Sequence, residues 1–403
     1  MGARVLILIA ALCACERRSS KYCELHPTDL AFCDRSDAAV DAPTSCTTNT
    51  ECAAADPFCE PASHICVECL TNTDCASKPG TPICDPARFA CVGCLVHADC
   101  PSDACLPDGT CGDDSNVIYV AEGGIDTNPC THDKPCKLIA HAITLLTTMR
   151  PYIRLSGSLV ESVTIANKRA TFLADPTTTL TGVADPTMKL QMSEIRIFDL
   201  TVAGTAAAGG IKSEMSSTTT LTRVTIRSGG KKGLEAKGGY LRVNRCTIAQ
   251  NVGGGIVLDA NADFSITNSF IYLNGAPNAA AGGVSIGAST MGNNQFEFNT
   301  VADNAAMAAG GGVRCPTTNS MSAPNNLIVA NTPDNTIGCD FASSLLGADV
   351  APFAFVGGNN YHIGATSTAR DTVTATSTIR EDFDGQFRPL GTAKDFGADE
   401  YKP

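Results

Sequence analysis

The sequence predicts an all-β protein in which residues 115–403 wind into a parallel β-helix, preceded by a small disulfide-rich region. Three observations predict this class. Apolar positions recur at steps of 22 to 30 residues, cysteines repeat in three groups of four, and 36 glycines accompany only 5% aromatic residues and no tryptophan. Because such a core must use small and β-branched side chains, thin stacked layers are favoured over a bulky sandwich.

The repeat begins near residue 190 and is marked by one apolar anchor per turn, at successive steps of 24, 22, 23, 30 and 27 residues. A second apolar column stands five residues before each anchor, and a third stands eight to thirteen residues after it. One rung of three short strands cannot pair its own backbone, but rungs stacked about 4.8 Å apart pair with one another. The columns are Val202, Ile226, Ile248, Ile271, Val301 and Ile328; Ile197, Leu221, Val243, Ile266, Phe296 and Ala323; and Ile211, Leu234, Ile256, Val284, Val313 and Ile337.

Asparagines mark one corner of the predicted coil, where we expect left-handed backbone and amides stacked on one another. The two longest steps come from residues 275–281 and 305–309, both between the first and second strands of a rung. A solenoid tolerates such insertions because both flanking columns keep their register. The sequence lacks the tight hairpins of an antiparallel sandwich and the pattern of a leucine-rich repeat. The corner asparagines are Asn251, Asn274, Asn304 and Asn331.

Three four-cysteine units fill residues 46–112, and the first gap of each is five residues long, reading TTNTE, LTNTD or LVHAD. A unit of about 20 residues has no room for a core, so bridges must hold it, typically at about 2–4 kcal/mol each. Zinc sites usually use closer cysteine pairs, which makes metal the weaker interpretation. Of the three pairings that four cysteines allow, we favour first to third and second to fourth. In the first unit this joins Cys46 to Cys59 and Cys52 to Cys66.

The two flanks of the coil carry a family resemblance. Residues 118–146 contain a strand, a GxD turn, a Pro-rich loop and a short amphipathic helix, and residues 383–401 contain Arg-Pro followed by Asp-x-Gly-Ala-x-Glu. Both segments resemble the ends of bacterial right-handed parallel β-helix proteins. The resemblance implies a right-handed coil whose open end is plugged by the helix, and it specifies architecture better than activity. The plugging side chains are Ile139, Ala142, Ile143 and Leu146.

Residues 1–14 predict an export signal, with one arginine and an apolar run too short to span a bilayer. The stretch LCAC that ends at Cys15 resembles the lipobox of bacterial lipoproteins, in which the cysteine is diacylated and becomes the N-terminus. The resemblance implies a lipid anchor at Cys15 and a place in the cell envelope, with the outer membrane or cell surface favoured. An ordinary signal peptide cleaved nearby is the alternative.

Residues 15–45 are polar and rich in Ser, Asp, Thr and Pro, which predicts a flexible tether in which Cys23 and Cys33 close one loop. The four-cysteine array that follows resembles repeats near the N-terminus of many Gram-negative lipoproteins, where they look like stalks. The resemblance implies a rigid spacer, and a binding module is the alternative.

Five cysteines lie within the coil region. Cys130 and Cys136 flank the Pro-rich loop, and we expect them to form a bridge, a departure from the plainer loop of the family. Cys315 and Cys339 each fall two residues beyond an anchor on adjacent rungs, and the rung spacing lies within disulfide range, so we expect a bridge or, failing that, two touching thiols. Cys246 has no cysteine neighbour in its column. Because 19 cysteines, an odd number, remain once Cys13 is removed with the signal peptide and Cys15 is acylated, we expect a buried free thiol at Cys246.

Charge and cysteine content limit the partners. The chain carries 29 lysines and arginines against 41 aspartates and glutamates, a net charge of -12, which disfavours an anionic nucleic acid. Its 21 cysteines imply an oxidising compartment. We therefore expect no nucleic acid partner. The expected partners are membrane lipid through acylated Cys15 and a polysaccharide or surface protein.

Proteins that the coil resembles are often polysaccharide lyases, hydrolases or esterases, which raises the question of a catalytic site. None of the six histidines lies in the rungs, and we predict no cofactor or metal site. The candidates are Asp199, Arg223 and Arg245, at equivalent corners of consecutive rungs. An arginine base beside carboxylates that hold calcium would suit a lyase, whereas a solvated ion-pair ladder is the simpler interpretation. Lys212 and Glu235 stack similarly on the second strand.

We therefore expect a lipid-anchored, non-catalytic surface protein whose coil serves adhesion or glycan contact. The alternative is a polysaccharide-active enzyme, a uronate lyase or glycosidase, that uses the side of Arg223 and Arg245. Calcium would be needed only under the lyase alternative. Phe270 and Tyr272 are the only outward aromatic pair in the rungs, which gives thin support for a sugar-binding platform.

Overall fold

The computed structural model describes most of the chain from the first four-cysteine unit onward. The expected signal peptide, Cys15 and the tether with Cys23 and Cys33 lie outside the described residues. No helix among the described residues is long and apolar enough to cross a membrane. The described residues are 46–402 without Ala76, Pro79, Ala87, Ala260, 288–293, Ala309 and 316–320.

The first compact unit, here called the cysteine module, consists of residues 46–95 with 108–110. It contains two antiparallel hairpins. Its elements are η2 Asn49–Glu51, β1 Phe58–Glu60, β2 Ile65–Val67, α2 Asn72–Cys75, β3 Ile83–Asp85 and β4 Ala90–Val92. Its two complete four-cysteine units are paired first to third and second to fourth, the connectivity favoured from the sequence. The bridges are Cys46–Cys59, Cys52–Cys66, Cys69–Cys84 and Cys75–Cys91.

The repeated five-residue gap has a structural reason. Its third residue accepts a hydrogen bond from the backbone N–H of the unit's third cysteine, at 2.8 Å for Asn49 and 3.0 Å for Asn72. Its fifth residue, Glu51 or Asp74, accepts hydrogen bonds from backbone N–H groups at the start of the gap. The gap is therefore a capped turn that holds the first bridge in place.

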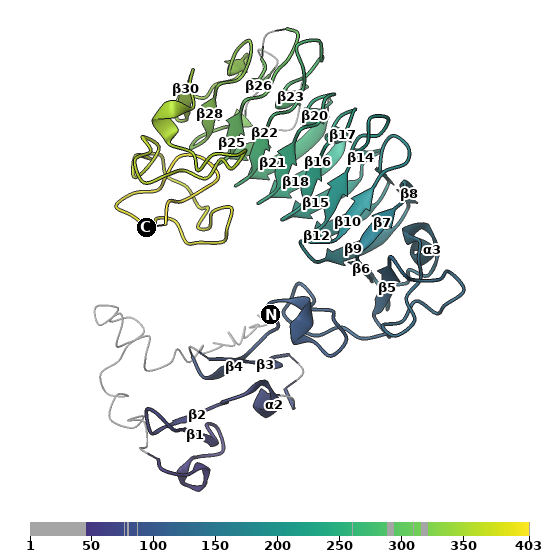
Figure 1. Cartoon of the computed structure of the whole chain (residues 1–403), viewed down its shortest axis with the longest axis vertical. Coiled ribbons are helices and arrows are strands. Elements are labelled where there is room, and N and C mark those ends of the chain that lie inside the picture. Colours follow the sequence, from purple (N-terminus) through teal and green to yellow (C-terminus); the bar gives the residue numbers. More distant parts are fainter. Residues whose placement is uncertain are drawn as a thin grey trace, which may run out of the picture. The chain divides into compact units, whose positions relative to one another are not determined.

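The second compact unit is a parallel β-helix whose three sheets appear as stacked arrows in Figure 1. Sheet 1 contains β5 Val117–Ala121, β6 Tyr152–Ser156, β9 Arg169–Ala174, β12 Glu194–Phe198, β15 Thr218–Thr222, β18 Gly239–Asn244, β21 Ala262–Thr267, β24 Asn294–Glu297 and β27 Met321–Ser322. Sheet 2 contains β7 Ser158–Val160, β10 Thr179–Thr181, β13 Thr201–Ala203, β16 Thr225–Arg227, β19 Thr247–Ala249, β22 Phe270–Tyr272, β25 Thr300–Ala302, β28 Leu327–Val329 and β30 Leu345–Gly347. Sheet 3 contains β8 Val163–Ala166, β11 Met188–Gln191, β14 Ile211–Glu214, β17 Leu234–Lys237, β20 Ile256–Leu258, β23 Val284–Ile286, β26 Val313–Arg314 and β29 Thr336–Ile337.

The apolar columns lie in the register that the sequence predicted. Ile226 pairs with Val202 on one side and with Ile248 on the other, and all three are fully buried. The same column continues through Ile271, Val301 and Ile328. The other two columns pair in the same way along sheets 1 and 3 up to the last rung. One continuous core therefore runs along the coil.

The last position of the third column was predicted one residue too late. Val313 pairs with Thr336, and Ile337 is 41% exposed. The earlier anchors of this column each follow a glycine, whereas Ile337 does not, because Gly338 comes after it. Cys339 is thus offset from the column of Cys315, yet the two Cα atoms are 5.1 Å apart and the sulfur atoms are bonded.

The first open end of the coil is covered by α3 Ile139–Thr144, as the resemblance implied. Asp126 in the GxD turn accepts hydrogen bonds from two backbone N–H groups just before the helix, both at 2.9 Å. Cys130 and Cys136 form the expected bridge across the intervening loop. The side chains that pack on the core are Ile139, Ala142 and Ile143 of the helix and Leu146 just after it.

The third four-cysteine unit is divided between the two compact units, and residues 96–107 belong to the unit that contains the coil. Arg154 on β6, only 2% exposed, donates hydrogen bonds to the backbone carbonyl of Asp103 at 2.7 Å and to its carboxylate at 2.9 Å. The same guanidinium also reaches Asp175 at 2.6 Å. This buried cation fixes residues 96–107 on the first rungs, because removing either partner would leave a charge unpaired.

In the third unit, His97 stands at the position that asparagine occupies in the earlier gaps, and it begins η3 His97–Asp99. His97 Nδ1 accepts a hydrogen bond from the backbone N–H of Cys105 at 3.0 Å, the role that asparagine plays in the first two units. Cys100 is bonded to Cys111, and Cys94 and Cys105 are also disulfide-bonded. The capped turn is therefore common to all three units.

A buried asparagine ladder occupies the corner between sheets 2 and 3. Each side-chain amide donates to the amide oxygen of the next rung at 2.9–3.0 Å, and each oxygen also accepts a backbone N–H. The left-handed backbone expected at the asparagines lies one residue earlier, because the residue that makes the bend turns the next side chain inward. The ladder is Asn251, Asn274, Asn304 and Asn331, and the left-handed residues are Gln250, Leu273, Asp303 and Ala330.

Residues 348–402, here called the C-terminal segment, fold back along the late strands of sheet 2 (Figure 1). They begin with η4 Ala351–Phe353 and contain no further named helix or strand among the described residues. Phe270, expected to point outward into solvent, is only 3% exposed because this segment covers it, and Tyr272 packs against Tyr361. The aromatic pair that gave thin support for a sugar-binding platform is therefore covered by the C-terminal segment.

Candidate functional site

The three candidate catalytic residues occupy equivalent corners between sheets 1 and 2, as predicted, with left-handed backbone at each. Arg223 donates two hydrogen bonds to the carboxylate of Asp199, at 2.6 and 2.7 Å. The hydrogen bond to Asp199 raises the pKa of Arg223, so its guanidinium is held as a cation. A bidentate pair of this kind orients both side chains and leaves no free base.

Arg245, one rung further along, is covered by the C-terminal segment and has a side chain that is 16% exposed. Its Nε donates to the carbonyl of Phe383 at 2.7 Å, and its Nη1 lies 3.5 Å from Glu381. Burial, together with the neighbouring Arg223, lowers its pKa. Arg245 therefore fastens the C-terminal segment to the coil.

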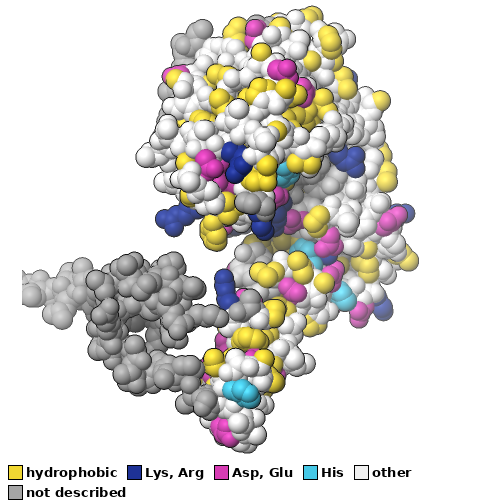
Figure 2. Space-filling view, turned by 60° about the vertical axis from the view of Figure 1, so that its left-hand side comes forward, with side chains coloured by type: hydrophobic (Ala, Val, Ile, Leu, Met, Phe, Trp, Pro, Cys, Tyr) yellow, Lys and Arg dark blue, Asp and Glu magenta, His cyan; other side chains and the backbone are white. Residues whose placement is uncertain are grey.

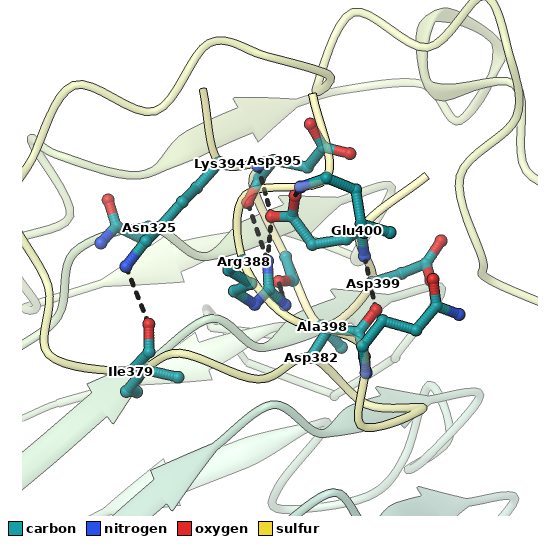
Figure 3. A network of polar contacts seen from close by, with 12 residues as sticks. Asn325, Ile379, Asp382, Arg388, Lys394, Asp395, Ala398, Asp399 and Glu400 are labelled. Atoms are coloured by element: carbon teal, nitrogen blue, oxygen red, sulfur yellow. Dashed lines mark hydrogen bonds and ion pairs between the residues drawn. The ribbon is translucent and has the colours of Figure 1, made fainter. Parts of the chain in front are cut away.

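The closing motif found in the sequence performs a similar structural task (Figure 3). Arg388 is buried, pairs with Glu400 at 2.8 Å, and lies over the ring of Phe298 at 4.2 Å. Glu400 in turn accepts the backbone N–H of Asp395 at 2.7 Å. The Arg-Pro and Asp-x-Gly-Ala-x-Glu elements are thus two halves of one buried ion-pair network. Their side chains face each other and not a ligand cavity.

Lys212 and Glu235 lie side by side on neighbouring strands of sheet 3, as the sequence predicted. Lys212 reaches Glu214 at 3.0 Å on its own strand and Glu235 at 3.7 Å on the next. Lys189, one strand earlier, reaches the other oxygen of Glu214 at 3.1 Å. Burial raises the pKa of Glu214, but the hydrogen bonds from Lys212 and Lys189 prevail and lower it to about 2. We call Lys189, Lys212, Glu214 and Glu235, with Lys237, the lysine–glutamate ladder.

A groove of about 390 Å³ adjoins this ladder and is the candidate functional site. It is lined by residues of β14 and β17 and of the loops that precede β11, β17 and β20. Lys232 pairs with Glu235 at its edge, whereas Lys231 is exposed and forms no ion pair with any described residue. Its lining includes Asp185, Pro186, Ile211, Lys212, Lys231, Lys232, Glu235 and Gly253. One free and two oriented ammonium groups suit a carboxylate or other anion.

Figure 2 shows acidic, basic and hydrophobic side chains interspersed on the visible face of the coil. The groove was not predicted, because Lys231 and Lys232 lie in a turn outside the repeating columns. The sequence signal was the pair of adjacent lysines in the glycine-rich stretch GGKKG.

Sequence reasoning also missed a cluster around His362, because it looked for histidines only within the rungs. The C-terminal segment brings the His362 ring to 4.8 Å from the ring of Phe270 on β22. Its Nε2 lies 3.3 Å from Asp384, and Asp399 is close by. Burial raises the pKa of Asp399 to about 8.

Cys246 is the free buried thiol that the sequence predicted, and burial raises its pKa to about 12. Its Sγ accepts a hydrogen bond from the backbone N–H of Val224 at 3.4 Å. A buried thiol with a raised pKa is a poor nucleophile. Cys246 therefore belongs to the core and not to a reactive site.

Comparison with known proteins agrees with the architecture. The family described as "Right handed beta helix region" matches residues 177–346, so the coil is a right-handed parallel β-helix. The chain is similar to a crystal structure of pectate lyase Pel9A, at 16% identity and a TM-score of 0.47, over 71% of this chain and 96% of that one. It is also similar to a rhamnogalacturonan lyase, at 14% identity and a TM-score of 0.29, over 68% and 99%. No curated protein matches the sequence. These likenesses carry no information on activity.

Proposed function

We propose that the protein is a non-catalytic scaffold of the cell envelope that contacts anionic glycan through the groove beside the lysine–glutamate ladder. The observation that carries the proposal is Lys231, an exposed ammonium without an ion-pair partner among the described residues, beside two lysines held in place by glutamates. A uronate carboxylate would form an ion pair with Lys231. The held lysines lose little side-chain entropy on binding, since they are already ordered.

The arginine corner supports the non-catalytic part of the proposal. A lyase base must be free to take a proton from the substrate. Arg223 is held by Asp199, and Arg245 is held by the carbonyl of Phe383. The lyase alternative therefore requires the arginine that acts as the base to leave its partner before the reaction starts.

Glycan binding is tested with the full chain carrying Cys15→Ser, so that no acyl group is attached. Calorimetry with polygalacturonate should detect binding that Lys231→Glu weakens at least about 10-fold, equivalent to about 1.4 kcal/mol. Lys134→Glu makes the same charge change at an exposed lysine outside the groove and should leave binding unchanged. Equal losses in the two variants, or no binding by the parent chain, would refute the groove as a glycan site.

The same sample tests the enzymatic alternative. Incubation with polygalacturonate and calcium should give no rise in the ultraviolet absorbance of unsaturated uronate. A rise that disappears in Arg223→Ala would overturn the non-catalytic proposal.

The place in the envelope is a separate part of the proposal. The bridges of the cysteine module support an oxidising compartment, where such bonds persist. The lipobox-like stretch supports acylation of Cys15 and attachment to a membrane. Cells fed an alkyne-tagged fatty acid should label the parent chain and not Cys15→Ser, and the variant should move to the soluble fraction. Label retained by the variant would rule out this anchor.

A further inference from the structure

We propose that His362, Asp384 and Asp399 form a binding site for one divalent transition metal ion, with zinc the best match. Each residue offers one ligand atom, and the three atoms lie within 4.8 Å of one another. Zinc–ligand distances of about 2.0–2.2 Å place oxygen and nitrogen ligands of a tetrahedral site about 3.3–3.6 Å apart, so modest side-chain rotation closes the set. The site is separate from the lysine groove and does not depend on the proposed glycan contact.

The orientation of His362 is the first independent support. Its Nδ1 faces the amide oxygen of Asn360, which can only accept, so the proton of the neutral ring sits on Nδ1. The lone pair of Nε2 is then directed toward Asp384, whose Oδ2 is 3.3 Å away. A lone pair facing a carboxylate is repulsive unless a cation lies between them. The hydrogen bond from Nδ1 to Asn360 is the usual arrangement at a histidine whose other ring nitrogen binds a metal ion.

The burial of Asp399 is the second independent support for the metal site. It is 4% exposed and forms no ion pair with any described residue. One carboxylate oxygen accepts the backbone N–H of Ile363 at 2.8 Å. A buried carboxylate without a cation is costly, and a metal ion would both neutralise it and use its remaining oxygen. Asp384, 42% exposed on its side chain, lies on the solvent side and gives the ion a path of entry.

The ligand types select among metals. One imidazole nitrogen with two carboxylates suits zinc and its neighbours, whereas calcium takes six to eight oxygens. The rings of Phe270 and Phe383 flank His362, at centroid distances of 4.8 and 5.7 Å, and keep one side of the site apolar. The three ligands come from well-separated positions of the C-terminal segment. A bound ion would therefore join three parts of this segment to one another, beside Phe270 of β22.

The alternative is a protonated His362 that simply pairs with Asp384. The two cases differ in whether metal binds, so the test uses the full chain with Cys15→Ser, purified without reductant and stripped with a chelator. Calorimetry with zinc chloride should show one ion bound per chain at micromolar affinity or tighter, and calcium at the same concentration should not compete. Zinc should also raise the melting temperature of the coil.

The variants assign the ligands. Asp399→Asn, His362→Gln and Asp384→Asn should each weaken zinc binding at least about 100-fold, and Asn360→Ala should weaken it about 10–100-fold. His132→Gln is the matched control, because His132 also faces an aspartate, with its Nδ1 3.1 Å from Asp133, and it should leave binding unchanged. Asp384 is partly exposed, so Asp384→Asn reports on binding even if a buried variant fails to fold. Absence of zinc binding, or binding kept by Asp384→Asn and His362→Gln, would overturn the proposal.

Discussion

The cysteine module and the coil are both built from repeats, but their repeats are stabilised in opposite ways. In the module, the buried cluster of the second unit consists of cysteines alone, and two bridges close each complete unit on itself. In the coil, a single apolar core runs through all rungs, and each rung supplies the backbone partners of the next. The module is a chain of self-contained units, whereas the coil is one cooperative stack.

The same residue type shows this contrast at close range. Asn49 and Asn72 bond to a backbone N–H within their own unit, which closes a local turn. Asn274 bonds to Asn251 and Asn304 on neighbouring rungs, which joins the turns of the coil to each other. A polar side chain at a repeated position therefore stabilises either the unit or the interface between units. The kind of core decides which, because the rungs share one apolar core, whereas the buried cluster of the second four-cysteine unit consists of cysteines.

Reduction of the disulfides should cause the largest difference in stability between the cysteine module and the coil. We expect a mild reductant to unfold the cysteine module, since each bridge contributes about 2–4 kcal/mol to a unit without an apolar core. The middle rungs of the coil should stay folded, because its bridges, Cys130–Cys136 and Cys315–Cys339, lie near its two ends. Hydrogen exchange read by mass spectrometry should show loss of protection in residues 46–95 and retained protection in residues 195–300. Simultaneous loss in both regions would contradict the contrast.

The asparagine ladder should matter to the stability of the coil as the disulfides matter to that of the cysteine module. Asn274→Ala removes the acceptor of the Asn251 backbone N–H and the donor to the carbonyl of Ile248, at 3.1 and 2.7 Å. Both groups are buried, and each unsatisfied group costs about 1–3 kcal/mol, so we expect a loss of about 2–5 kcal/mol in urea unfolding of the coil.

Asn335→Ala is the matched control, because Asn335 terminates the same ladder at a partly exposed position. Water can replace its hydrogen bonds, so the expected loss is about 1 kcal/mol or less. Equal losses at Asn274 and Asn335 would mean that the ladder does not act through burial.

The sequence predicted the coil well because inward side chains repeat once per rung and cannot move without exposing the core. Ile226, Ile248 and Ile271 therefore pair as expected. The prediction was wrong at Ile337, where the glycine that usually precedes the strand follows it instead. Register is fixed by burial, so it is least certain at the end of the stack.

The sites were harder to predict because they depend on the C-terminal segment, which has no repeat. Sheet 2 contained one usable signal. Outward positions of β13 and β16 are partly or fully exposed, whereas β25 and β28 are buried at every position and β28 reads Leu-Ile-Val. An all-apolar strand is buried on both faces, so a covering segment could have been predicted there. Nothing in the sequence placed His362 beside Asp384 and Asp399, since irregular backbone gives no periodicity to follow.

The smallest expected difference between the coil and the cysteine module is in how their stability depends on pH. Ion pairs between the rungs of the coil titrate, whereas the disulfides of the module do not. The pKa of Glu214 falls from its ordinary value near 4.5 to about 2 in the folded chain. Its contribution to stability is therefore complete above pH 4.5 and is lost as the pH falls toward 2. Glu214→Gln should lower the unfolding free energy of the coil by about 1 kcal/mol at pH 7 and leave it nearly equal to the parent at pH 2. Glu194→Gln, at a more exposed ion-paired carboxylate on sheet 1, is the control and should change the pH profile less. If the unfolding free energies of the parent and of Glu214→Gln change with pH in parallel, the lysine–glutamate ladder makes no pH-dependent contribution to the stability of the coil.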